Sequence, residues 1–440
     1  MSERYDAVVV GAGCAGALLA MGLAAGGNSV LLLDRKAGDW SGPRTRDLIE
    51  EESLDSAGLG AGRFGERPGG IEVVSPYTAT RVSVPGGRFR VVDGRALLEH
   101  LLEGAREAGA RLLSGCVAGG TEIRNGFVTG VTTDRGTFSC RLAVDASGPE
   151  RVLCRTIPSG MGIPRRIRSG DHVSVYREVR RLAVKSPREA AEGVFRFYIG
   201  RYGGYSWTCP GGDGTVDIGT AVQDRAGSPD PREILLGYVR SEPSVGEEVL
   251  AVDGGRVATR RPLNTMVTNG LMVVGDAACQ ATPVIARGTG GALIGGSLAA
   301  ATAVRALSGG EASMAALWSY NSEYMRARGA DMAALDCLRL LMQHMTEKEF
   351  SWSMARGVID EQEIAAALRG RFEVPTAQVK IRNVLKGLSG VPLLVRYDGA
   401  LKLAGRVQQH YREYPSTYDA EAFADWAQGA DFLLEDAEKV

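Results

Sequence analysis

The sequence has no closely spaced pair of cysteines. Its seven cysteines are scattered over 440 residues, at Cys14, Cys116, Cys140, Cys154, Cys209, Cys279 and Cys337. Zinc and iron–sulfur sites need clustered thiolates, so this spacing argues against both kinds of metal site. An odd, dispersed set is typical of a reducing compartment rather than of a disulfide framework. We therefore expect a cytoplasmic protein without a metal centre.

The sequence also lacks an excess of one charge and a long apolar run. It has 51 basic and 52 acidic residues, whereas a nucleic-acid-binding surface needs a basic excess, so no nucleic-acid partner is expected. The start of the chain does not read as a signal peptide, because its apolar run is a short strand that enters a glycine turn. The apolar stretch Gly291–Leu307 contains Arg305 and several glycines and is too short to cross a bilayer. Contact with a membrane is expected to be peripheral at most.

The order of the periodic segments predicts an α/β protein. Buried strands are expected at Tyr5–Val10, Ser29–Asp34 and Leu271–Gly275. Strand-like alternation also covers residues 71–92, with a turn at Pro85-Gly86-Gly87, and residues 121–146 and 172–222, whereas residues 35–70 are expected to form loop and short helix. Helices are predicted at Cys14–Ala25, Arg95–Ala108, Pro231–Arg240, residues 290–307, and along the chain from Ala312 onward.

The first strand is followed by a glycine motif of the kind that binds dinucleotides. Gly11, Gly13, Ala15 and Gly16 belong to a G-x-G-x-x-G that opens a helix. Such glycines permit a tight turn and a close approach of a pyrophosphate to the helix N-terminus. Asp34 closes the next strand, where its carboxylate can accept hydrogen bonds from both ribose hydroxyls. An acid at this position favours FAD or NAD over a cofactor with a 2′-phosphate.

A second motif favours FAD over NAD. The predicted strand that begins at Leu271 ends in Gly275-Asp276-Ala277-Ala278, which places Asp276 to bind a ribityl hydroxyl. Gly288 and Thr289 then open a glycine-rich helix whose N-terminus can point at the flavin and stabilise its anionic reduced form. We therefore predict FAD as the cofactor.

With both motifs in this order, the sequence resembles the flavoproteins of the p-hydroxybenzoate hydroxylase type, which have a glutathione-reductase-like FAD-binding fold. Val144-Asp145-Ala146-Ser147-Gly148 resembles the middle D-G motif of that superfamily, with Ser147 where Asp is usual. The resemblance implies that Arg95, at the start of its helix, reaches the flavin nucleotide. Capping of the helix is the alternative role for Arg95.

A further segment resembles the geranylgeranyl reductase family, which includes archaeal digeranylgeranylglycerophospholipid reductases. Tyr205-Ser206-Trp207-Thr208-Cys209-Pro210 is similar to the P-x-x-Y-x-W-x-F-P segment of that family, with Tyr202 in place of its first proline and Cys209 in place of its phenylalanine. Strand alternation puts Tyr205, Trp207 and Cys209 on one face. The resemblance implies that this face forms an apolar slot for a prenyl chain beside the flavin; a plain core strand is the alternative.

The resemblance extends over nearly the whole chain and implies further cofactor contacts at Thr45, Arg46 and Val117. The segment from Pro43 to Ile49 occupies the place of the family's P-x-[RK]-C-[GA]-E-G-I, with Thr45 in place of the cysteine. Thr289 stands where an aliphatic residue is usual. These departures surround the flavin and the pocket, so they bear on the substrate more than on the cofactor.

The expected domains follow from these assignments. Residues 1–150 form the first part of the FAD-binding domain, with the strands of 71–92 directed toward the substrate domain. Residues 151–255 form an inserted antiparallel β-sheet substrate domain, residues 256–310 complete the FAD-binding domain, and residues 311–440 form a helical C-terminal region.

The family resemblance implies an oxidoreductase of phospholipid metabolism. Reduced FAD would deliver hydride to C=C bonds of geranylgeranyl chains, either in membrane lipids or in prenyl diphosphates. Tyr205 and an ordered water are the candidate proton donors. A ferredoxin-like protein and free reduced nicotinamide remain open as electron donors, since no second G-x-G-x-x-G is present.

Several other functions remain alternatives. A flavin-dependent monooxygenase or halogenase and a prenylquinone side-chain reductase share the predicted fold. The halogenase lacks support because no lysine lies between Lys36 and Lys185, and a membrane quinone oxidoreductase of the electron-transfer-flavoprotein type lacks support because only Cys337 follows Cys279. A flavin-binding scaffold without catalysis is the alternative outside enzymes.

Overall fold

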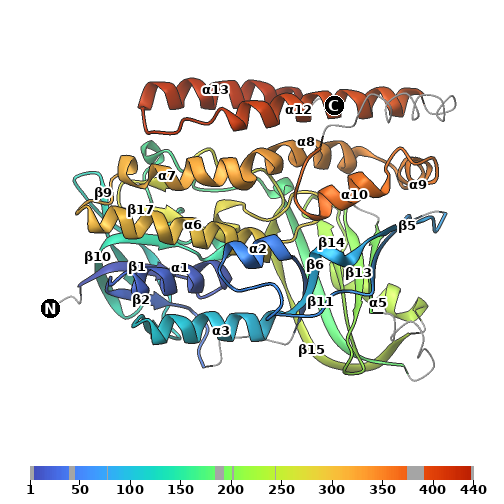
Figure 1. The fold of residues 1–440 in the computed structure, drawn as a ribbon, viewed down its shortest axis with the longest axis horizontal. Coiled ribbons are helices and arrows are strands. Elements are labelled where there is room, and N and C mark those ends of the chain that lie inside the picture. The colour runs from blue at the N-terminus through green and yellow to red at the C-terminus, as the bar shows by residue number, and fades with distance from the viewer. Residues whose placement is uncertain are drawn as a thin grey trace.

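The structure is a computed structural model that describes residues 4–38, 45–76, 78–183, 193–200, 203–242, 244–373 and 391–437. It is a mixed α/β molecule (Figure 1). Tyr202, Pro43 and Arg44 lie outside the described residues.

The part of the molecule that holds the N-terminal strands is built on a sheet of eight strands within the described ranges, two of which come from residues 267–273. Its path is β16-β17-β10-β1-β2-β7, with β9 pairing β10 and β8 pairing β9. Strand β1 lies between β10 and β2 and is parallel to both, as expected for the predicted dinucleotide-binding unit. The strands are β1 (Arg4–Val10), β2 (Val30–Leu33), β7 (Arg111–Leu113), β8 (Ala118–Arg124), β9 (Phe127–Thr133), β10 (Gly136–Asp145), β16 (Val267–Thr268) and β17 (Leu271–Val273).

Helices cover this sheet. Helix α1 contacts both α3 and α6, and α6 also contacts α7. Their bounds are α1 (Cys14–Ala25), α3 (Gly94–Glu107), α6 (Thr289–Ser308) and α7 (Met314–Tyr324). Helix α6 is long and apolar enough to cross a membrane by length and composition, but 72% of its apolar window is buried inside the protein. It is a core helix of this fold.

A second sheet, of seven strands in the described ranges, lies to the right in Figure 1. Its order is β15-β11-β14-β13-β12-β4-β5, and the pairs are antiparallel except for β12 with β4. The strands are β4 (Gly70–Val74), β5 (Arg81–Val84), β11 (His172–Leu182), β12 (Val194–Ile199), β13 (Tyr205–Pro210), β14 (Thr215–Gln223) and β15 (Val245–Ala258), and helix α5 (Pro231–Ser241) packs on β14 and β11.

The C-terminal region is helical, as predicted. A π-helical turn at Met325–Gly329 leads into α8, which packs against α12, and α13 packs on the outer side of α12 (Figure 1). Helices α9 and α10 begin with capping boxes at Thr346 and Asp360. The bounds are α8 (Ala330–His344), α9 (Glu347–Ala355), α10 (Glu361–Leu368), α12 (Val391–Arg412) and α13 (Ala420–Ala437).

One part of the predicted pattern needs correction. Residues 35–70 were expected to contain no strand, but β3 (Arg46–Glu50) pairs antiparallel with β6 (Phe89–Asp93) and leads into α2 (Glu51–Ser56). The predicted turn at Pro85-Gly86-Gly87 does lie between two strands, β5 of the seven-stranded sheet and β6 of the β3–β6 ribbon. The ribbon brings residues 46–50 close to the N-terminus of α6.

Candidate active site

The three glycines of the first motif have distinct roles at the carboxyl end of β1. A Cβ on Gly11, which has φ +106°, would lie 2.3 Å from the carbonyl oxygen of Ala146. A Cβ on Gly16 would lie 2.0 Å from the carbonyl oxygen of Gly11. A Cβ on Gly13 would meet no atom within 4 Å. The first and third glycines therefore allow close packing, whereas the second leaves open space at the N-terminus of α1, where a pyrophosphate fits.

Asp34 follows β2 and lies beside this turn. Its carboxylate accepts hydrogen bonds from the backbone N–H groups of Ala12 and Lys36, both at 2.8 Å. These bonds fix the carboxylate next to the glycine turn and leave further lone pairs on its oxygens. The geometry fits the predicted contact with ribose hydroxyls.

Asp276 follows β17 and lines a cavity of about 350 Å³, which we call the flavin-side pocket. Gly13, Cys14, Ala15, Ala146, Gly148 and Gly288–Ala292 line the same pocket. Burial raises the pKa of Asp276 to about 6, and no donor among the described residues pairs with its carboxylate. A buried carboxylate without a protein partner fits a ligand that supplies hydroxyl donors, as a ribityl chain does.

A network of polar side chains lies where the seven-stranded sheet borders the flavin-side pocket. Arg177 donates to Asp217 at 2.6 Å and to Asp47 at 3.1 Å, and its guanidinium lies 5.6 Å from the Trp207 ring centre. Burial opposes the charge on Arg177, but the two carboxylates outweigh it and raise its pKa. The Nε1 atom of Trp207 donates to Asp217 at 3.1 Å, and the Thr289 hydroxyl donates to Asp47 at 2.9 Å. The network links β3, β11, β13, β14 and the start of α6.

Three further charged side chains, Glu50, Arg287 and Arg328, line the flavin-side pocket. Glu50 is buried and pairs with Arg287 at 3.1 Å and with Arg328 at 3.5 Å. Burial acts to raise the pKa of Glu50, but the two guanidinium groups outweigh it and lower that pKa. One carboxylate therefore faces two cations, so these three side chains carry a net positive charge next to the N-terminus of α6. This charge suits an anionic reduced cofactor.

A second cavity of about 350 Å³, which we call the apolar cavity, lies between the seven-stranded sheet and the C-terminal helices. Its floor comes from strands β4, β11, β12 and β13, and its roof comes from helices α8, α9, α10 and α12. The apolar side chains that line it include Val73, Val173, Ile199, Leu338, Met342, Phe350, Met354 and Ile364. Its volume falls in the range of small-molecule binding sites.

The two cavities share a wall made of Phe197, Tyr205 and Ala286, which line both. The Tyr205 hydroxyl donates to the carbonyl oxygen of Ile285. Burial raises the pKa of Tyr205, so its hydroxyl is protonated at neutral pH. Tyr205 therefore lies between a molecule in the apolar cavity and a molecule in the flavin-side pocket.

The predicted pocket residues of β13 divide between these cavities. Tyr205 lines both cavities and Trp207 lines the flavin-side pocket. Cys209 points to the same face but lines neither cavity, because it is buried in the core of the seven-stranded sheet. A contact between Cys209 and a prenyl chain therefore has no support from either cavity and stays a prediction.

The other predicted cofactor residues lie in different surroundings. Arg46 lines the flavin-side pocket and binds Asp213 at 2.7 Å, whereas Thr45, just before it, does not line that pocket. Arg95 lines neither cavity and pairs with Glu99 at 2.8 Å along α3. Val117 is 50% exposed, and its N–H donates to Asp134 at 2.9 Å. Contacts of these residues with a cofactor stay predictions.

Sequence reasoning missed the charged residues of the pocket. Glu50, Arg287 and Arg328 come from three elements, and 237 residues separate Glu50 from Arg287. Phe195 and Phe197 had a local signal, because alternation on β12 places them on one face. Asp47 lay next to the predicted Arg46 and was not singled out.

The comparisons with known proteins agree with this geometry. No family model matches the chain. The digeranylgeranylglycerophospholipid reductase of Sulfolobus acidocaldarius is 28% identical over 99% of this chain and 98% of that protein. The enzyme of the same name from Methanoculleus marisnigri is 28% identical over 74% of this chain and 83% of that protein.

Solved structures share the fold. A geranylgeranyl bacteriochlorophyll reductase-like protein from Thermoplasma acidophilum aligns with a TM-score of 0.73 at 18% identity, covering 91% of this chain and all of that one. A flavin-dependent brominase aligns with a TM-score of 0.64 at 17% identity, covering 90% and 99% of the two chains. The chain has the fold of FAD-dependent oxidoreductases and is a full-length homologue of proteins named digeranylgeranylglycerophospholipid reductase.

Proposed function

We propose that this chain is an FAD-dependent reductase that saturates C=C bonds in the isoprenoid chains of lipids. The observation that carries the proposal is the wall shared by an apolar cavity and a pocket with the features of a flavin site. The curated relatives, named for reduction of a digeranylgeranyl lipid, support the same assignment. We assign the cofactor-binding unit to the glutathione-reductase-like type.

The residues of the chain would hold the cofactor in three places. The open space at Gly13 and the carboxylate of Asp34 suit the pyrophosphate and a ribose, and Asp276 suits the ribityl chain. When bound, the reduced flavin supplies a hydride to one carbon of the double bond. The protein's own contribution is orientation, since Phe197 and Tyr205 fix where an apolar chain meets the flavin-side pocket.

The apolar lining also excludes water from the reacting bond. In the cavity roof, Leu338 and Met342 of α8 and Phe350 of α9 offer no polar group to a double bond. Tyr205 is the proposed proton donor to the second carbon, because it is protonated and lies in the shared wall. The electron donor remains a choice between a ferredoxin-like protein and free reduced nicotinamide.

The test gives the dithionite-reduced holoenzyme geranylgeranyl-bearing lipids without oxygen and follows products by mass spectrometry. We expect gains of two mass units per double bond reduced. A protein that cannot be reconstituted with FAD contradicts the proposed cofactor. No gain on prenyl compounds, together with an oxygen-dependent gain of sixteen units on an aromatic compound, would move the assignment to a flavin-dependent monooxygenase.

A further inference from the structure

One end of the apolar cavity is polar. Arg225, Thr259, Arg339 and Gln343 line it there, and all four carry hydrogen-bond donors. They lie where β11 begins, where β14 and β15 end, and along α8. The structure therefore offers an apolar chain a cavity with a group of donors at one end.

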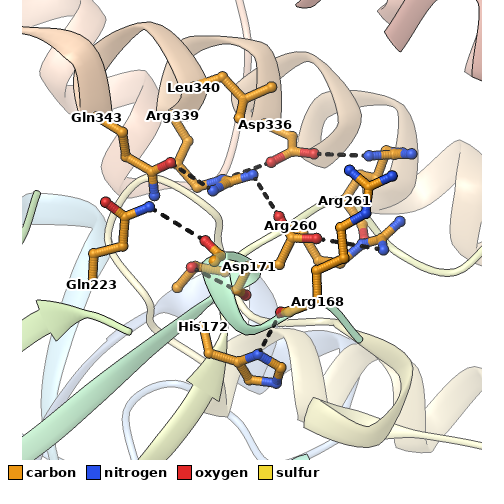
Figure 2. Close-up of polar contacts among 12 residues, drawn as sticks. Arg168, Asp171, His172, Gln223, Arg260, Arg261, Asp336, Arg339, Leu340 and Gln343 are labelled. Atoms are coloured by element: carbon orange, nitrogen blue, oxygen red, sulfur yellow. Dashed lines mark hydrogen bonds and ion pairs between the residues drawn. The ribbon is translucent and has the colours of Figure 1, made fainter. Parts of the chain in front are cut away.

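Arg339 and Gln343 belong to a largely buried charged cluster in which arginines exceed carboxylates (Figure 2). Arg339 binds Asp336 at 2.7 Å and Asp171 at 3.1 Å, whereas Arg261 binds Asp336 at 3.4 Å and Arg260 lies 3.7 Å from Asp171. Three guanidinium groups thus share two carboxylates. Burial opposes ionisation of Asp336, but the arginines outweigh it and lower its pKa, so its charge is present at neutral pH. The cluster keeps a net positive charge beside the cavity.

Two of the lining donors remain available to a ligand. Gln343 accepts a hydrogen bond from Arg339 at 2.9 Å through its Oε1 atom, and its amide nitrogen has no partner among the described residues. Arg225 is exposed at the cavity edge and forms no ion pair among the described residues. Two acidic residues, Glu347 and Glu363, also line the cavity, and both are engaged with other groups of the protein. The Glu363 carboxylate accepts a hydrogen bond from the N–H of Asp360 at 3.2 Å.

Strand register gives the cavity a direction. Val173 on β11 pairs with Gln223 on β14, Ala221 pairs with Tyr205 on β13, and Tyr205 pairs with Ile199 on β12. Strand β12 in turn pairs with β4, which contributes Val73. The cavity therefore crosses five neighbouring strands, a span of roughly 19 Å for four strand spacings. The charged cluster lies at the β11 end of the cavity, and α9 and α10 line its β4 end. The shared wall with Tyr205 of β13 lies between these two ends.

We propose that the charged cluster binds the phosphate group of an isoprenoid lipid, while its prenyl chain crosses the strands toward β4 and passes the shared wall. This inference rests on the proposed function and deepens it. Gln343 and Arg225 contact the phosphate, and Arg339 contacts it through the N–H groups that Asp336, Asp171 and Gln343 leave unused. A phosphate is the preferred ligand because guanidinium and amide donors converge there without a free carboxylate.

The experiment compares geranylgeranyl phosphate with geranylgeraniol, which has the same chain and no charge. Binding to the FAD-loaded protein is measured by equilibrium dialysis, and reduction is measured in parallel by mass spectrometry. The variants are Gln343→Glu, which adds a negative charge beside Arg339, and Arg225→Gln. The control variant is Arg124→Gln, whose side chain is 73% exposed in the β8–β9 hairpin.

We expect wild type and Arg124→Gln to bind the phosphate more tightly than the alcohol. Gln343→Glu is expected to weaken phosphate binding roughly tenfold, the loss of one charge-assisted hydrogen bond, and Arg225→Gln roughly threefold because it is exposed. Binding of the alcohol is expected to stay within twofold of wild type in every variant. Thermal unfolding and flavin content, measured on each variant, identify any variant that fails to fold.

The outcomes separate the two proposals. Equal binding of phosphate and alcohol in wild type, or equal losses for both ligands in Gln343→Glu, would overturn the phosphate site. Selective loss of phosphate binding without reduction of either ligand would support the site and overturn the proposed reductase function. A third measurement uses a digeranylgeranylglycerol phosphate in vesicles and shows whether the protein prefers a lipid head group or a free prenyl phosphate. Gln343→Glu is expected to weaken binding of whichever of these two phosphate ligands wild type binds more tightly.

Discussion

Asp276 is a carboxylate whose surroundings penalise its charge. Its pKa in the folded protein is raised to about 6 by burial, above the value of 3.8 for an unperturbed group. The folded, cofactor-free protein therefore holds a proton in a pH range where the unfolded chain has lost it. Uptake of this proton by Asp276 stabilises the folded state. The resulting contribution to the free energy of unfolding is complete below about pH 4 and is lost as the pH rises through 6. Hydroxyl donors from a cofactor act in the opposite sense, because they favour the ionised carboxylate.

Asp276→Asn is predicted to have opposite effects on stability and on cofactor binding. At pH 7 the cofactor-free variant should gain roughly 1–3 kcal/mol in free energy of unfolding, because a desolvated charge is removed. FAD should bind the variant more weakly, and the tightening of FAD binding from pH 5 to pH 7 in wild type should disappear. Denaturant unfolding and fluorescence titration with FAD measure both. An unchanged pH dependence of FAD binding would place the ribityl chain elsewhere.

Trp207 combines a ring that lines the pocket with an N–H that binds Asp217. Trp207→Phe keeps a ring but removes the donor, so we predict a loss of about 1–2 kcal/mol in free energy of unfolding with flavin still bound. Trp207→Ala removes the ring as well. It should therefore lower prenyl turnover below that of Trp207→Phe, because Arg177 and Tyr205 of the shared wall lose their packing partner. Turnover equal to wild type in both variants would assign Trp207 to the core alone.

At the scale of elements, α10 forms part of the roof above the β4 side of the apolar cavity. Ile364 lines the cavity there and is 9% exposed. Ile364→Trp is predicted to shorten the cavity, so that turnover of a geranylgeranyl substrate falls at least several-fold while a geranyl substrate is retained. Gln362→Trp, on the exposed side of the same helix, is the matched control. Equal losses for long and short chains would show that Ile364 does not limit chain length.

The elements that sequence predicted well are those whose signal is local. The glycine turn, β1, α1 and the acid at Asp34 follow one another along the chain, so spacing alone identified them. Strand β15 was missed because Gly254 and Gly255 and several charges break its alternation. The structure gives the reason for Gly254, since a Cβ there would lie 2.5 Å from the carbonyl oxygen of Val175 on β11.

The parts of the site that sequence could not predict depend on contacts between distant segments. Glu50, Arg287 and Arg328 meet only after β3, the loop before α6 and the π-helical turn have packed together. The polar end of the apolar cavity likewise needs α8 to lie against the start of β11, which brings Arg339 to Asp171. No periodicity in one sequence encodes such pairings.

At the scale of the whole molecule, α12 packs against α8 and contributes to the cavity roof, and α13 packs against α12 (Figure 1). Trp426 of α13 stacks on His410 of α12 with ring centres 5.2 Å apart, and its Nε1 atom donates to the His410 carbonyl oxygen at 3.0 Å. Trp426→Ala is predicted to lower the free energy of unfolding by about 3–5 kcal/mol. Flavin affinity should change little, since Trp426 lines neither cavity. A selective loss of flavin without loss of stability would contradict a purely packing role.

The wall formed by Phe197, Tyr205 and Ala286 places the apolar cavity so close to the flavin-side pocket that the absorption spectrum of a bound flavin should report lipid binding. Two small-molecule sites that are separated by only three side chains lie within reach of each other's electric field, so filling one changes the surroundings of a chromophore in the other. Adding a prenyl lipid to the oxidised, oxygen-stable holoenzyme should therefore shift the yellow absorption band before any electron is transferred. A spectrophotometric titration would then rank candidate lipids by affinity without knowledge of the natural electron donor. An absorption spectrum that stays unchanged with every lipid would show that occupancy of the apolar cavity does not affect the flavin.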